Sequence, residues 1–139
     1  MKNTYLLIFV LGLIISCDTE RKKEQALYKE VMDTHDEVMP EMGTLRALSK
    51  TLQLHADSIQ QDSTRLDPEE LFRIDSLKER LEKANESMRQ WMRDFQPLEE
   101  GTPHGEVLQF LIEQKKRIDK VRDDMMKAKD GADKYLKEN

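Results

Sequence analysis

The sequence predicts an all-α fold, an antiparallel three-helix bundle that becomes four helices if the first one breaks at Pro40. Glycine and proline are scarce, with 5 and 4 among 139 residues, and aromatic residues make up 6%, whereas charged residues make up 37%. This composition is typical of long helices and not of β-sandwiches. Apolar residues also recur at helical spacing in three stretches. The connections between these stretches are short, which favours antiparallel neighbours.

The first helical stretch is expected from about Arg21 to Gln61. Pro40 interrupts it, because a proline inside a helix removes one hydrogen bond and clashes with the carbonyl of Asp36. We therefore expect a kink near Pro40 or a break, with Met42-Gly43 as the candidate position of the break. The apolar stripe of this stretch recurs every seven residues and comprises Val31, Val38, Leu45, Leu52 and Ile59.

The second stretch begins with a helix-start signal at Asp67-Pro68-Glu69-Glu70. Asp67 is a good N-cap, Pro68 suits the first helical position, and Glu70 is placed to close a capping box. The helix is expected to end before Pro97. Its stripe follows a spacing of three and four residues and comprises Ile74, Leu77, Leu81, Ala84, Met88, Trp91 and Phe95.

The third stretch opens at Thr102-Pro103, again a cap residue followed by proline. Gln114 is the one polar interruption of its stripe, and Gly131 is expected to weaken its last turns by about 1 kcal/mol relative to alanine. The apolar positions are Leu111, Ile118, Val121, Met125, Ala128, Ala132 and Tyr135.

The start of the chain is typical of an export signal. An apolar run extends from Tyr5 to Ile15 and ends in Ser16-Cys17. We expect residues 1–16 to be a lipoprotein signal peptide, Cys17 to carry the palmitate-type lipid, residues 17–24 to be a tether, and residues 25–139 to form the bundle. Two or three acyl chains would anchor the protein durably to a membrane. The alternative is a transmembrane anchor or a secretory signal with a chance cysteine.

Composition excludes several classes of function. Removal of 16 residues leaves 123, and the loss of Lys2 changes the net charge from −5 to −6. No basic patch with interleaved aromatic residues occurs, so we expect no nucleic-acid partner. Cys17 is the single cysteine, which excludes a disulfide within the chain. A nucleophile elbow, a Glu-x-x-His pair and a glycine-rich phosphate loop are all missing from the sequence, so we expect no enzyme.

One group of residues suggests a ligand. The antiparallel register places Met39 beside Trp91 and Met42 beside Met88, and it brings His104 to the same end of the bundle. Thioethers with an imidazole suit Cu(I), and a neighbouring indole can add a cation–π contact. The candidate metal residues are His35, Met39, Met42, Met88, Trp91 and Met92, with Met32 on the same face.

Two other interpretations of this cluster remain open. Methionine commonly fills irregular cores, so the favoured interpretation is ordinary packing without a cofactor. A b-type haem held by one methionine and one histidine is the other, although small apolar residues for its pocket are few. His55 and Met125 are expected to approach each other at the opposite end.

Three features resemble a group of small flavobacterial-type helical lipoproteins, some of which are labelled "viral A-type inclusion protein". They are the lipobox at Cys17, the run His35-Asp36-Glu37-Val38-Met39-Pro40, and Trp91-Met92. The resemblance covers most of the mature chain and implies an exported helical lipoprotein without an established activity.

The expected function is therefore a structural or interaction module of the cell envelope, lipid-anchored on the periplasmic side or at the cell surface. Its seven-residue stripes also suit coiled-coil contacts with a protein partner or a second copy of the chain. The alternative is a Cu(I)-binding or metal-handling periplasmic lipoprotein that uses the Met/His/Trp cluster.

Overall fold

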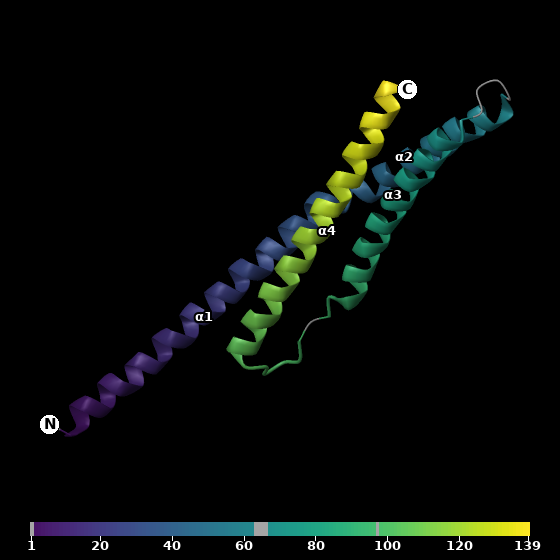
Figure 1. Cartoon of the computed structure of the whole chain (residues 1–139). Helices are drawn as coiled ribbons and strands as arrows, with labels where there is room; N and C mark the ends of the chain where they lie inside the picture. The colour runs from purple at the N-terminus through teal and green to yellow at the C-terminus, as the bar shows by residue number, and fades with distance from the viewer. Residues whose placement is uncertain (1, 63–66, 97) are drawn as a thin grey trace.

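The computed structural model describes the backbone of residues 2–62, 67–96 and 98–139, and the side chains in these ranges from residue 19 onward. In these ranges it contains α1 (Lys2–Val38), α2 (Glu41–Gln61), α3 (Pro68–Asp94) and α4 (His104–Glu138), and no strand. Helices α1 and α2 form one bent rod, and α3 returns beside α2 (Figure 1). Helix α4 packs against α1, α2 and α3. The predicted all-α bundle is confirmed, in its four-helix form.

The break between α1 and α2 lies at Met39-Pro40 and not at Met42-Gly43, which are inside α2. Proline has no backbone N–H, so the carbonyl of Asp36 loses its helical donor at this position. The chain turns instead, with the N–H of Met42 donating to the carbonyl of Met39 and the N–H of Gly43 donating to that of Pro40 (3.3 and 3.2 Å).

The start of α3 confirms the predicted N-cap. Asp67 Oδ1 accepts hydrogen bonds from the backbone N–H groups of Glu69 and Glu70, at 2.9 and 3.3 Å, and Pro68 is the first helical residue. The Glu70 carboxylate does not form the predicted capping box. It reaches across to α4 and accepts a hydrogen bond from the Tyr135 hydroxyl.

The start of α4 differs from the prediction. Pro103, and not Thr102, occupies the N-cap position, and no side chain caps the helix there. The Thr102 hydroxyl donates backwards to the carbonyl of Glu99, at 2.7 Å. Gly101 precedes it with a φ of +91°, a backbone conformation that favours glycine. These features turn the chain at residues 99–102, just before the start of α4.

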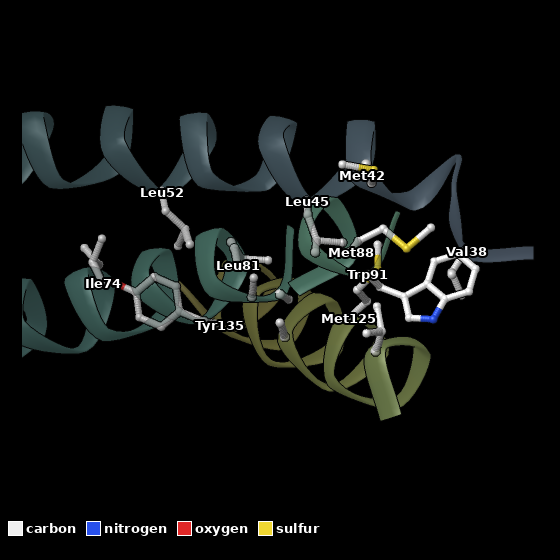
Figure 2. Packing of buried hydrophobic residues seen from close by; sticks show 14 of the residues in the cluster. Val38, Met42, Leu45, Leu52, Ile74, Leu81, Met88, Trp91, Met125 and Tyr135 are labelled. Atoms are coloured by element: carbon white, nitrogen blue, oxygen red, sulfur yellow. The ribbon is translucent and has the colours of Figure 1, made fainter. Parts of the chain in front are cut away.

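The core is formed by the predicted stripes. The seven-residue repeat of α1 and α2 is buried along its whole length, and so are the main positions of α3 and α4. Figure 2 shows how side chains from the helices meet along this line. The largest fully buried side chains are Leu45, Leu52, Ile74, Leu81, Met88, Ile118, Met125, Val31 and Val38.

The first residues of α1 carry the predicted export signal. The side chains of residues 1–18, Cys17 included, lie outside those described, so the signal peptide and the lipid remain predictions. Residues 17–24, which we expected to be the lipidated cysteine and a tether, have helical backbone. The described core cluster begins at Val31 and ends at Tyr135, so a chain that starts at residue 17 contains all of it. In the parts of the chain described here, none of the helices is long and apolar enough to span a membrane.

Candidate functional site

The predicted Met/His/Trp cluster lies at the junction of α1, α2 and α3. Met42, Met88 and Trp91 are buried in one core cluster, and Met92 packs against it. Figure 2 draws Met42 on α2 and Met88 and Trp91 on α3, facing the same part of the core. Three of the six candidate residues therefore gather in the core as the register predicted.

His35 joins this group through its ring. The imidazole lies 5.6 Å from the Trp91 ring, measured between centroids. Its Nδ1 lies 2.8 Å from Asp36 Oδ1, which leaves Nε2 as the nitrogen that a metal could reach. The imidazole is therefore oriented by a carboxylate on one side and an indole on the other.

Met39 does not join the group, because it lies at the surface and is 44% exposed. The spacing of Met32, His35, Met39 and Met42 places them on one face only if the helix is continuous. Helix α1 ends at Val38, so Met39 belongs to the turn and no longer follows that face.

A series of stacked aromatic rings extends from this cluster toward the start of α4. Trp91 stacks on Phe95 with ring centroids 4.9 Å apart, and Phe95 stacks on Phe110 at 5.9 Å. Tyr28 of α1 adds a tilted contact to Phe95 at 6.2 Å. Each such pair contributes about 0.5–1.5 kcal/mol beyond the area it buries. These rings, which we call the aromatic ladder, join α1, α3 and α4 at one end of the bundle.

His104 lies at this end but not beside His35. Its Nδ1 is 2.6 Å from Glu24 Oε1, which joins the first turn of α4 to α1. Glu24 precedes His35 by eleven residues, or about 16 Å along a helix. His104 therefore lies at the predicted end of the bundle, but it is not part of the cluster around His35.

A large pocket opens between α1, the α3–α4 connection and α4, with a volume of about 820 Å³. Its walls are mainly apolar and include three rings of the ladder, Tyr28, Phe95 and Phe110. Its polar side chains come from Glu24, Gln25, Glu99, Thr102 and His104. Volume and lining both match those of small-molecule sites in proteins. We call this the anchor-side pocket, because it lies at the end of the bundle nearest Cys17, where a lipid anchor is expected from the sequence.

The opposite end of the bundle is joined by a polar network. Tyr135 of α4 donates to Glu70 Oε1 of α3 at 2.8 Å, and His55 Nε2 of α2 lies 3.5 Å from the same oxygen. The His55 ring meets the Tyr135 ring edge-on at 5.8 Å, and Arg73 lies over the Tyr135 ring at 5.5 Å. Burial and the neighbouring carboxylate raise the pKa of Tyr135 to about 12. His55 thus meets Tyr135, where we expected Met125.

Metal-binding groups of the usual kind are missing from the described residues, where no three histidine, cysteine, aspartate or glutamate side chains gather closely enough to hold an ion.

Sequence reasoning missed the anchor-side pocket and the polar network. Both depend on pairs that are distant in the sequence, Glu24 with His104 and Glu70 with Tyr135. One feature of the sequence could have indicated the pocket. Aromatic residues are rare in this chain, and two of them, Phe95 and Phe110, flank the connection that contains Gly101-Thr102-Pro103.

The comparisons with known proteins add no family: no family model matches the chain, and neither does a curated protein or a solved structure. The resemblance to helical lipoproteins therefore remains an expectation.

Proposed function

We propose that this chain is an exported lipoprotein whose helical bundle is an interaction module held at a membrane surface. The observation that carries this proposal is the Tyr5–Ile15 apolar run followed by Ser16-Cys17. A lipoprotein signal peptidase requires this pattern, and the lipid on the cysteine would replace a membrane-spanning helix as the anchor.

The fold supports an interaction role close to the membrane. Residues 18–24 are a helical part of α1 that connects Cys17 with Glu24, and Glu24 makes a contact with α4. Seven residues of helix span about 10 Å, so the bundle would begin that far from the lipid. The anchor-side pocket would then face the zone next to the headgroups.

Acylation tests this proposal. Cells that express the full chain are grown with an alkyne analogue of palmitate, and the protein is examined for the label. We expect label on the wild-type chain and none on Cys17→Ala, because the thiol is the attachment point. Ser16→Gly is the matched control, since it keeps a small residue before the cysteine and should still be labelled. Label that persists on Cys17→Ala would contradict the proposal.

The second candidate function is Cu(I) binding, which the contact between His35 and Trp91 favours. Imidazole Nε2 and the thioethers of Met42 and Met88 would be the ligands, with Trp91 adjacent. We expect His35→Ala and Met88→Leu to weaken Cu(I) binding in a chelator competition. The exposed Met39→Leu variant is the control and should bind as the wild type does. Equal affinity in all three variants would rule out this site.

A further inference from the structure

We infer that the anchor-side pocket binds an amphiphile with one apolar chain and a cationic head group. The inference concerns the ligand of the proposed interaction module. It rests on that proposal only for the position of the pocket near a membrane, because the argument for the ligand comes from the shape, lining and charge of the pocket.

The lining predicts an apolar body for the ligand. Apolar side chains converge on the pocket from α1, the connection and α4. A volume of about 820 Å³ lies in the upper part of the range for small-molecule sites. Apolar surface that is open to water is favourably covered, which supplies the driving force for an alkyl chain. The apolar residues that form the walls include Tyr28, Met32, Phe95, Leu98, Val107 and Phe110.

The charges of the lining predict a positive head group. The pocket contains two carboxylates, Glu24 and Glu99, and one histidine, His104, and its described lining has neither lysine nor arginine. The net charge of these three side chains is negative whether or not His104 is protonated. A cationic head would therefore be attracted to this rim, whereas an anionic head would be repelled.

The rings supply a second contact for a cation. Phe95 and Phe110 lie 5.9 Å apart in the wall, and Tyr28 lies 6.2 Å from Phe95. Phe95 already stacks on Trp91 and on Phe110, so Phe110 and Tyr28 are the rings that can offer a face to a cation. Such faces attract ammonium groups, particularly alkylated ones that are weakly hydrated. Carboxylates together with aromatic faces favour a quaternary ammonium head over a sugar or an alcohol.

Calorimetry on the purified chain tests the inference directly. The chain from residue 17 with Cys17→Ser contains the whole described core and carries no lipid of its own. Dodecyltrimethylammonium is the probe, used below its micellar concentration. We expect saturable 1:1 binding, about tenfold tighter than that of dodecyl sulfate or dodecyl maltoside. Shortening the probe by two methylenes should weaken binding about fifteenfold, since each buried methylene changes affinity about fourfold.

Two pairs of variants locate the ligand. Val107→Phe fills the pocket and should weaken dodecyltrimethylammonium binding at least tenfold, whereas Ile112→Phe changes an exposed position of the same helix and should have no effect. Glu99→Gln removes a rim charge and should weaken binding about threefold. Glu113→Gln is its control, because Glu113 is exposed and does not line the pocket. Circular dichroism checks that each variant is folded.

Several results would overturn the inference. They are the absence of saturable binding, equal or tighter binding of dodecyl sulfate, and unchanged binding in both Val107→Phe and Glu99→Gln. Failure of the proposed function would be distinguishable, because acylation is measured in cells on Cys17 and the pocket is measured on a chain without that cysteine. Binding of the probe without acylation in cells would leave the pocket assigned and remove only its membrane position.

Discussion

At the end of the bundle nearest Cys17, the rings of Trp91, Phe95 and Phe110 stack and Tyr28 of α1 packs against them at a tilt, whereas a single carboxylate joins α2, α3 and α4 at the far end. The rings of the aromatic ladder are held together by stacking and not by hydrogen bonds, and a pocket of about 820 Å³ adjoins them. The polar network around Glu70 and Tyr135 depends on specific hydrogen bonds, and Tyr135 is only 3% exposed.

The difference suggests a division of roles along the bundle. Hydrogen bonds have strict geometry, so the polar network fixes how α4 is aligned with α2 and α3. Dispersion and stacking are more tolerant of small shifts, so the aromatic ladder can hold the helices together and still adapt to a ligand. The following predictions test this comparison, from the largest expected effect to the smallest.

The largest effect is expected from Trp91→Ala, in the aromatic ladder. Loss of the buried indole should lower the free energy of unfolding by about 3–5 kcal/mol. Trp91→Phe should cost only about 1–2 kcal/mol. The indole Nε1 is buried without a hydrogen-bond partner among the described residues, so its removal leaves no acceptor without a donor. Urea unfolding followed by circular dichroism measures both. Equal losses would show that Nε1 makes an essential bond.

Tyr135→Phe should have the next largest effect, at the far end. The hydroxyl donates to a carboxylate at 2.8 Å, and the loss of such a bond costs about 1.5–3 kcal/mol. Tyr28→Phe is the matched control at the near end, because Tyr28 is half exposed and contributes its ring to the ladder. Its free energy of unfolding should stay within about 0.5 kcal/mol of the wild-type value. Similar losses in the two variants would remove the contrast between the ends.

The same tyrosine predicts a dependence on alkaline pH. Its pKa is about 12 in the folded chain, and a tyrosine in the unfolded chain ionises near pH 10. The folded state keeps the proton longer, so this contribution to stability is complete below pH 10 and is lost as the pH rises toward 12. The free energy of unfolding should fall more steeply between about pH 10 and pH 12 in the wild type than in Tyr135→Phe. Parallel curves for the two proteins would contradict the assignment.

Gly131→Ala should produce the smallest change, an increase in stability of about 0.5–1 kcal/mol. An added Cβ would meet Leu77 Cδ2 at 3.6 Å, which is an ordinary contact. Gly101→Ala is the contrasting variant, because its φ of +91° is strained for alanine and should cost about 1 kcal/mol or more. Thermal unfolding ranks the two, and stabilisation by both would mean that the α3–α4 connection has a different backbone.

The sequence predicted the fold well where local rules act alone. The repeat of Val31, Val38, Leu45, Leu52 and Ile59 can form only one stripe, and all five residues are buried. Asp67-Pro68 likewise predicted the start of α3, because a cap and its proline act within one turn.

The candidate site was predictable only in part. Met42, Met88 and Trp91 meet because the α2–α3 register follows from a short connection, whereas Met39 is displaced by the turn at Pro40. The pairing of Glu24 with His104 spans 80 positions and depends on the offset of α4 along α1, which no local pattern encodes.

Aromatic NMR signals of the mature Cys17→Ser chain, recorded during a titration with dodecyltrimethylammonium, compare the two ends in one experiment. We propose that the end nearest Cys17 binds a ligand and that the far end only holds the helices together. The account predicts that the ring signals of Tyr28, Phe95 and Phe110 shift saturably while those of His55 and Tyr135 stay in place. Shifts that are largest at Tyr135, or equal at both ends, would contradict it.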